Sequence, residues 1–219
     1  MKLVFEHQNK NKKAKYLKIA IVDYNMGNLA SVKNAFLKCE QEADVIKNKD
    51  DIFKYDHVIL PGVGAFGDAM DSLKESGFDE SIKEYANNGG KLLGICLGAQ
   101  LLFDKGDEFG LHSGLGLIPG TVKIFDKNRF KIRLKVPHMG WNKVRLKEDR
   151  VFDGIDDNVY LYFVHSHHIE CEDKYIIGTT EYGYEFASIV KNNNIYGIQP
   201  HPEKSHDNGI KMIQNFINL

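Results

Sequence analysis

Hydrophobic residues in the first half of the chain follow two alternating patterns. Short apolar runs typical of buried strands occupy 18–24, 43–46, 57–60 and 91–95. Segments with apolar residues three or four positions apart, as on one face of a helix, occupy 28–39 and 73–86, and another begins at Leu97. Strands that alternate with helices of this length predict a mainly parallel sheet with helices on both faces.

The pattern changes after Gly120. From 129 to 136 basic residues alternate with apolar ones, which predicts an antiparallel strand with one basic face. Further short strands are predicted at 160–164, 176–181, 187–190 and 195–199, and a closing helix at 208–217. No repeat or flexible linker separates the two halves. The sequence therefore predicts one α/β domain over 18–219 with an antiparallel elaboration in its C-terminal half.

The bulk composition argues against several kinds of partner. The chain carries 29 Lys and Arg against 30 Asp and Glu, a formal net charge of -1, whereas nucleic-acid binding usually needs a basic excess. Its apolar runs are far shorter than the roughly 20 residues that span a bilayer, so no membrane is expected. Three well-separated cysteines without zinc-type spacing favour a reducing compartment, here the cytoplasm, and no metal site.

The first residues have a composition of their own. The segment 1–17 holds five lysines and one glutamate, and it lacks the apolar stretch of a secretory signal. We expect it to be a basic, mobile extension in front of the domain.

A candidate nucleophile lies where a predicted strand meets a predicted helix. The sequence Gly94-Ile95-Cys96-Leu97-Gly98 has the form of a nucleophile elbow, in which glycines permit a tight turn. The N-terminus of the following helix favours a thiolate and offers N–H groups to an oxyanion. An isolated cysteine between apolar neighbours is also a common core residue. The pentapeptide alone leaves both interpretations open.

A candidate base follows the last predicted strand. His201 stands in Gln199-Pro200-His201-Pro202-Glu203-Lys204, where two prolines restrict the backbone and Glu203 follows two residues later. A rigid His-Pro-Glu segment could direct both side chains to one side, so that the carboxylate orients the imidazole. A surface turn is the alternative interpretation of the same residues.

A glycine-rich segment follows the predicted strand 57–60. Gly62, Gly64 and Gly67 have the spacing of a dinucleotide-binding fingerprint. No carboxylate ends a strand about 20 residues later, which disfavours a nucleotide site. Parallel strands would instead bring Gly62 and Cys96 to the same carboxyl edge of the sheet, where the loop could supply N–H groups to an oxyanion.

The order of these three motifs resembles the class I (triad) glutamine amidotransferases. Within that family the chain is most similar to the glutaminase subunits of imidazole glycerol phosphate synthases. The similar segments run from about Lys18 to the C-terminus and are 23–28, 60–66, 94–98, 114–120, 137–142, 163–166 and 201–205. The resemblance implies a flavodoxin-like fold with a mainly parallel sheet flanked by helices.

The resemblance also implies a role for individual residues. Cys96 is then the nucleophile, His201 the general base and acid, and Glu203 the orienting carboxylate. The implied oxyanion hole is formed by Gly62, Val63, Gly64 and Leu97. The implied glutamine-binding residues are Gln100, Glu108, His165 and Ser166. No cofactor is implied.

A partner is implied as well. Subunits of this kind release ammonia from glutamine and pass it to a (β/α)8-barrel cyclase subunit in a heterodimer, which forms imidazole glycerol phosphate and aminoimidazole carboxamide ribotide in histidine biosynthesis. The positions that match the partner face of the family are Asn28, His138, Trp141, Tyr162 and Lys204.

Some residues depart from the family pattern and leave alternatives open. Pro200, His167 and His168 stand where aromatic residues are usual in these subunits. A paralogue that supplies ammonia to a barrel synthase amidinating a sugar for surface glycans is one alternative. A stand-alone cysteine hydrolase, a nucleotide-binding oxidoreductase and a noncatalytic binding subunit are others.

Overall fold

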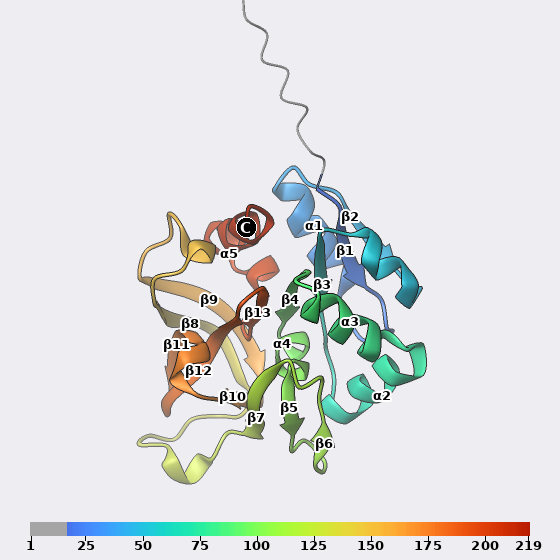
Figure 1. Cartoon of the computed structure of the whole chain (residues 1–219). Helices are drawn as coiled ribbons and strands as arrows, with labels where there is room; N and C mark the ends of the chain where they lie inside the picture. The colour runs from blue at the N-terminus through green and yellow to red at the C-terminus, as the bar shows by residue number, and fades with distance from the viewer. Residues whose placement is uncertain (1–16) are drawn as a thin grey trace, which may run out of the picture.

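One continuous twisted sheet crosses the molecule and changes from parallel to antiparallel along its width (Figure 1). The computed structural model describes residues 17–219, so the predicted extension 1–17 lies outside the described residues except for Leu17. Within the described range the main path of the sheet runs β2-β1-β3-β4-β13-β12-β10-β7-β5-β6. Strand β11 pairs with β12 and β8, and β9 pairs with β8.

The parallel part contains the strands that carry the candidate site. Its members, in spatial order, are β2 (Ala43–Ile46), β1 (Ile19–Val22), β3 (His57–Leu60), β4 (Lys91–Ile95) and β13 (Ile195–Ile198), and every neighbouring pair is parallel. All residues of β1, β3 and β13 are buried. Because both faces of these three strands are covered, they are nearly continuous apolar runs, which explains why the sequence predicted them well.

Helices cover both faces of this parallel part. Ala20 and Val22 of β1 pack in one core with α2 (Phe66–Ser76) and α3 (Phe78–Asn87). The alternate residues Ile19 and Ile21 pack in a second core with α1 (Leu29–Lys38) and α5 (His206–Ile217). The short helix α4 (Leu97–Leu101) follows β4 directly. The predicted three-layer α/β arrangement is confirmed.

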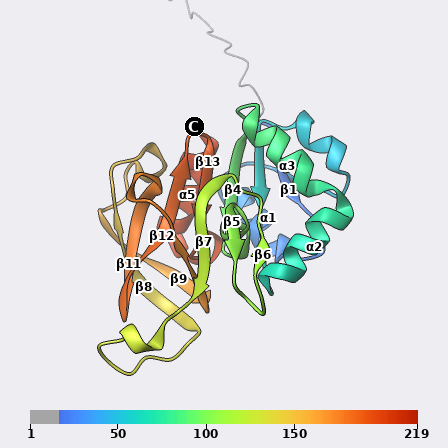
Figure 2. The same ribbon diagram turned by 60° about the horizontal axis from the view of Figure 1, so that its bottom comes forward.

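The other half of the sheet is mostly antiparallel. Its strands are β5 (Phe103–Gly106), β6 (His112–Ser113), β7 (Ile118–Ile124), β8 (His138–Leu146), β9 (Asn158–His165), β10 (His167–Glu170), β11 (Ile176–Tyr182) and β12 (Tyr184–Asn192). Strands β8, β9, β11 and β12 gather on the side of the molecule opposite α2 and α3 (Figure 2). In β9 exposed or partly buried residues alternate with buried ones, as in a sheet with one face packed on the core.

Two predictions about secondary structure were wrong. The segment 129–136 is not a strand: the 3-10 helix at Lys127–Arg129 is followed by exposed irregular chain, and β8 begins only at His138. Alternation of basic and apolar residues does not by itself provide a neighbouring strand to pair with. The segment predicted as one helix, 73–86, belongs to two helices, the first of which begins earlier, at Phe66. Gly77, with a φ of +71°, ends the first helix and separates it from the second.

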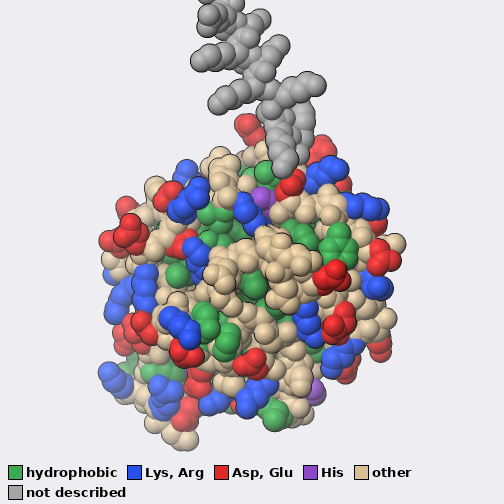
Figure 3. Space-filling model, in the orientation of Figure 1, with side chains coloured by type: hydrophobic (Ala, Val, Ile, Leu, Met, Phe, Trp, Pro, Cys, Tyr) green, Lys and Arg blue, Asp and Glu red, His purple; other side chains and the backbone are tan. Residues whose placement is uncertain are grey.

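The surface shows no dominant charge on the face seen in Figure 3. Basic and acidic side chains are intermingled there, in agreement with the balanced composition. None of the helices within 17–219 is long and apolar enough to cross a membrane.

Candidate active site

Cys96 occupies the sharp turn between β4 and α4. Its φ of 54° is unusual for a residue with a side chain, and its N–H donates to the carbonyl oxygen of Ile198 at 2.8 Å. The flanking glycines are required by close backbone packing. A Cβ on Gly98 would lie 1.8 Å from the carbonyl oxygen of Leu60, and one on Gly94 would lie 2.6 Å from that of Gly98. The turn therefore has the tight geometry of a nucleophile elbow.

His201 and Glu203 reach the same edge of the sheet because β13 lies parallel to β4. Ile198 is paired with Ile95, so the residues after both strands emerge together. His201 Nδ1 lies 2.7 Å from Glu203 Oε1, and the two side chains are only 5% and 2% exposed. A buried carboxylate on Nδ1 orients the ring so that Nε2 is the nitrogen left for chemistry.

The pKa of His201 reflects this environment. Burial disfavours the charged ring, but the interactions with Cys96 and Glu203 outweigh burial and raise the pKa of His201 to about 9. A protonated ring at this position places an imidazolium close to Cys96. A positive charge there stabilises a thiolate on Cys96.

The glycine-rich segment after β3 lies against this elbow. A Cβ on Gly62 would come within 2.8 Å of the Gly98 nitrogen and 2.9 Å of the Leu97 Cβ, so Gly62 is needed for close approach. The N–H of Val63, however, donates to the carbonyl oxygen of Met26 at 3.2 Å. In this conformation the Val63 donor is therefore not available to an oxyanion. Gly64 has a φ of +104°.

The nucleotide interpretation of these glycines is not supported by their surroundings. Gly67 lies within α2, and a Cβ there would lie 2.6 Å from the ring of His112. Gly62 packs on α4, as described above. Both positions thus require glycine for packing inside the protein, which accounts for the fingerprint spacing without a phosphate.

A cavity of about 350 Å³ opens beside Cys96. It is lined by Val63, Gly64, Cys96, Leu97, Gln100, Glu108, Pro137, Val164, His165, Ser166, His167 and His201. All four residues expected to bind glutamine are among these. Glu108 Oε2 also accepts the N–H of Phe66 at 2.8 Å, which fixes the carboxylate at the start of α2.

Two more of these four side chains are already engaged inside the protein. Gln100 Nε2 donates to the carbonyl oxygen of His167 at 3.1 Å and to Gln199 Oε1 at 2.9 Å. His165 makes hydrogen bonds through both ring nitrogens, to the carbonyl oxygen of His167 and to His138. Both ring nitrogens of His165 therefore already have protein partners.

The sequence interpretation missed several residues of the site. Tyr24 is buried below the loop and donates to the carbonyl oxygen of Pro61 at 2.8 Å, and burial together with nearby Cys96 raises its pKa. Gln199 is fully buried and Pro137 lines the cavity. The position of Gln199, directly after a strand that ends at the active edge, was the signal that could have identified it.

The residues expected on a partner face have different surroundings. Trp141 is 45% exposed and its ring stacks on His206 with centroids 4.8 Å apart. Asn28 and Lys204 are exposed, and Tyr162 is partly buried and pairs with Trp141 across β8 and β9. His138 is 2% exposed, and its ring stacks on Phe163 and Tyr182 in the interior.

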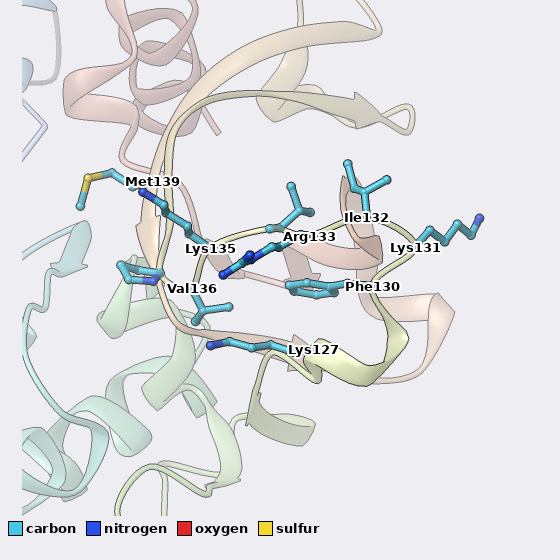
Figure 4. Close-up of a pocket in the computed structure, with 10 residues that line it drawn as sticks. Lys127, Phe130, Lys131, Ile132, Arg133, Lys135, Val136 and Met139 are labelled. Atoms are coloured by element: carbon cyan, nitrogen blue, oxygen red, sulfur yellow. The ribbon is translucent and has the colours of Figure 1, made fainter.

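A larger cavity of about 760 Å³ lies outside the triad (Figure 4). It is lined mainly by the irregular segment that was expected to be a strand, including Arg133 and Lys135, and also by Lys127. It contains no cysteine, histidine or carboxylate that could act as nucleophile, base or acid. The smaller cavity at Cys96 is thus the candidate active site. Within the described residues no cluster of His, Cys, Asp and Glu could hold a metal ion.

Comparison with known proteins identifies the family. The model of "Glutamine amidotransferase class-I" matches residues 20–219. The chain belongs to the class I glutamine amidotransferases. This amidotransferase is 59% identical over 90% of its length to the imidazole glycerol phosphate synthase subunit HisH of Sulfurimonas denitrificans, 96% of which is covered. The HisH subunits of Wolinella succinogenes and Helicobacter hepaticus are 47% and 44% identical over 92% and 93% of the chain, and each is 99% covered.

Solved structures agree with this assignment at the level of fold. A structure of PurLQS from Thermotoga maritima matches with a TM-score of 0.72 at 19% identity, covering 93% of this chain and 98% of that one. A solved glutamine amidotransferase matches with a TM-score of 0.71 at 16% identity, covering 91% and 99%. The amidotransferase fold expected from the sequence is confirmed.

Proposed function

We propose that this amidotransferase is the glutaminase subunit of an imidazole glycerol phosphate synthase, with Cys96, His201 and Glu203 as its catalytic triad. The observation that carries the proposal is the buried His201–Glu203 pair, with 2.7 Å between Nδ1 and Oε1, at the same sheet edge as the strained Cys96 turn. Its similarity to HisH subunits over nearly their whole length supports the pathway. Residues 18–219 then form a single catalytic domain.

The first half of the reaction is an acyl transfer to sulfur. The Cys96 thiolate attacks the side-chain amide carbon of glutamine, and the carbonyl oxygen becomes an oxyanion. Protonated His201 gives its proton to the amide nitrogen as the C–N bond breaks. Ammonia leaves and a glutamyl thioester remains on Cys96.

The second half is hydrolysis of the thioester. His201, now neutral, removes a proton from water as the water oxygen attacks the thioester carbon. The C–S bond breaks, the new carboxyl group releases its remaining proton to solvent as glutamate leaves, and the Cys96 thiolate is restored beside protonated His201. Glu203 stabilises the imidazolium in both halves through its hydrogen bond to Nδ1.

The oxyanion is stabilised by backbone N–H groups near the elbow. Leu97 is the first residue of α4, and its N–H is one such donor. The second is supplied by the Gly62, Val63 and Gly64 segment after a rotation of the peptide that releases the Val63 N–H from Met26. Losing one oxyanion donor costs on the order of 100-fold in rate, so this rotation would control activity.

The remaining cavity groups hold the amino-acid end of glutamine. Glu108 provides a negative charge for the α-ammonium group, and Gln100 adds a polar contact. Backbone groups at His165 and Ser166 provide the complementary hydrogen bonds to the α-carboxylate. This assignment uses His165 through its backbone, because both of its ring nitrogens are already hydrogen-bonded.

Released ammonia is used by a cyclase subunit that docks next to the site. The exposed Trp141, Lys204 and Asn28, with Tyr162, form the docking face, and the partner is a (β/α)8 barrel in a heterodimer. The N–H of His201 donates to the carbonyl oxygen of Tyr162 at 2.8 Å, so this face and the triad share a direct backbone contact. Docking over the site would shield the ammonia from bulk water until it reacts.

The deciding experiment measures glutamate release from glutamine. The purified chain is assayed alone and with the cyclase subunit from the same organism and its ribonucleotide ligand. The proposal predicts weak activity alone and strong stimulation in the mixture. Slow glutamine hydrolysis without stimulation would instead favour a paralogue that serves another synthase, such as one that amidinates a sugar.

A further inference from the structure

A chain of hydrogen bonds between uncharged side chains runs behind the candidate active site. Asn142 Nδ2 lies 3.1 Å from His138 Nε2, and His138 Nδ1 lies 2.9 Å from His165 Nε2. His165 Nδ1 in turn lies 2.7 Å from the carbonyl oxygen of His167. The chain thus leads from β8, across β9, to the backbone at the start of β10.

The direction of these hydrogen bonds is fixed by their two ends. The carbonyl oxygen of His167 can only accept, so His165 carries its proton on Nδ1 and its Nε2 accepts. His138 must then donate through Nδ1, which leaves its Nε2 as an acceptor for Asn142. The orientation of the Asn142 amide agrees, because Nδ2 also donates to the carbonyl oxygen of Glu181 at 3.0 Å and Oδ1 accepts the Lys143 N–H at 2.8 Å.

Burial keeps both histidines neutral. Their rings lie among Phe125, Phe163, Tyr182 and Phe186. Desolvation lowers the pKa of His138 to about 4 and that of His165 to about 3. The same single pattern of donors therefore persists throughout the neutral pH range.

The inner end of the chain meets the glutamine cavity. The carbonyl oxygen of His167 accepts from Gln100 Nε2 as well as from His165. Gln100 Nε2 also donates to Gln199, whose own Nε2 lies 3.9 Å from the Cys96 sulfur. One carbonyl oxygen thus joins the histidine pair to the side chains that shape the pocket.

The outer end of the chain lies on an exposed face. Met139 and Trp141, which flank this part of β8, are 62% and 45% exposed. His138 is the first residue of the same strand, and Asn142 is only partly buried. A partner bound on Met139 and Trp141 would therefore contact the strand that carries both outer members of the hydrogen-bond chain.

We infer that Asn142, His138 and His165 are positioning residues that hold the His167 carbonyl and thereby Gln100, and that they couple docking on β8 to glutamine affinity. This inference rests on the proposed function. It assigns to His138 a role in the interior in place of the surface role expected from the sequence. Loss of His138 would break the hydrogen-bond chain, because His138 Nδ1 is the donor to His165 Nε2.

Two substitutions of His138 distinguish this role from simple packing. The amide nitrogen of Asn can occupy the place of Nδ1, whereas that of Gln falls near Nε2. We expect His138→Asn to keep KM for glutamine within about threefold of the wild-type value, and His138→Gln to raise KM about tenfold, with kcat changed less than KM. The assay uses the chain in complex with its cyclase, with the unfolding midpoint of each variant measured in parallel.

Tyr182→Phe is the matched control. It keeps the ring stacked on His138 at 4.0 Å and removes only the hydroxyl that donates to the carbonyl oxygen of Lys135. We expect its KM for glutamine to be unchanged. Equal KM values for the Asn and Gln variants of His138 would overturn the inference.

A spectroscopic measurement keeps the inference testable if the variants do not fold. In the histidine-labelled wild-type chain, ¹⁵N imidazole shifts should show His138 and His165 as neutral Nδ1–H tautomers at neutral pH. An Nε2–H tautomer at either position would also overturn it. If the wild-type protein showed no glutaminase activity in the complex, that result would count against the proposed function. The measured tautomers of His138 and His165 would still test the hydrogen-bond chain independently.

Discussion

The hydroxyl of Ser205 donates to the carbonyl oxygen of His201 at 2.6 Å. The same hydroxyl accepts the N–H of Tyr162 at 2.9 Å, while the N–H of His201 donates to the Tyr162 carbonyl oxygen. Ser205 is 1% exposed. It therefore closes a ring of hydrogen bonds that fastens the His-Pro-Glu turn to β9, so the position of the base depends on a strand that lies far from it in sequence.

Removing this hydroxyl should loosen the base. We expect Ser205→Ala to lower the free energy of unfolding by about 1–3 kcal/mol, because the Tyr162 N–H loses its partner and the His201 carbonyl oxygen keeps only the Lys204 N–H. The value of kcat for glutamine should fall about tenfold. Ser76→Ala, which removes hydroxyl bonds to backbone carbonyls in α2, is the control. Equal losses of kcat in both variants would contradict a specific role for Ser205.

The triad should divide the activity of the complex into two parts. Cys96→Ala should abolish glutamine-dependent product formation, because no other sulfur lines the cavity. Folding, docking and ammonia-dependent synthesis should remain, since the cyclase would use ammonium salt directly. Assays with glutamine and with ammonium salt check both parts. Loss of both activities would refute this division of labour.

The orienting carboxylate should contribute strongly to rate and little to affinity. Glu203→Gln keeps the shape of the side chain but removes the charge that stabilises an imidazolium at His201. We expect kcat to fall on the order of 1,000-fold or more, with KM for glutamine changed only slightly. Steady-state kinetics in the complex decide this. A fall of only a few fold would mean that another group orients His201.

The glycine at 64 should be needed for activation by the partner. Gly64 has a φ of +104°, and an added Cβ would lie 2.9 Å from Met26 Cε. We expect Gly64→Ala to reduce the stimulation of glutamate release by the cyclase at least tenfold, because it restricts the peptide rotation that frees the Val63 N–H. Gly89→Ala is the control, since Gly89 has a φ of +87° and nothing within 4 Å of an added Cβ. Undiminished stimulation in Gly64→Ala would refute the rotation.

Acid should destabilise the fold through buried histidines. Burial lowers the pKa of His57, which packs edge-on against Phe216, to about 4. A lowered histidine pKa contributes stability above the unfolded pKa of about 6.5, and this contribution is lost as pH falls from 6.5 toward 4. His57→Phe should therefore reduce the loss of unfolding free energy between pH 7 and pH 4.5 by on the order of 2 kcal/mol. Denaturant titrations at both pH values check this, and an unchanged difference would contradict it.

Much of the fold and of the triad could be predicted from local sequence. Three strands of the parallel part, at 43–46, 57–60 and 91–95, have the predicted bounds. The strands 57–60 and 91–95 are covered on both faces and are therefore nearly continuous apolar runs, whereas the edge strand 43–46 has Asp44 and Val45 exposed. The motif at Cys96 is also local, since glycines are required wherever backbones approach too closely for a Cβ. The contact between His201 and Glu203 could also be predicted locally, because the two residues are only two positions apart and the neighbouring prolines restrict the backbone.

Other features depended on residues far apart in the chain. The segment 129–136 has the alternation of a strand but no pairing partner, and only the completed sheet decides where an edge is available. His138 matched a surface position by motif, yet it is buried because β8 pairs with β9 and sets it opposite His165. Likewise the bond from Val63 to Met26 joins two loops. The sequence by itself thus determined the apolar strands and the reactive residue types, while tertiary pairing decided which polar atoms face the cavity and which satisfy one another inside the protein.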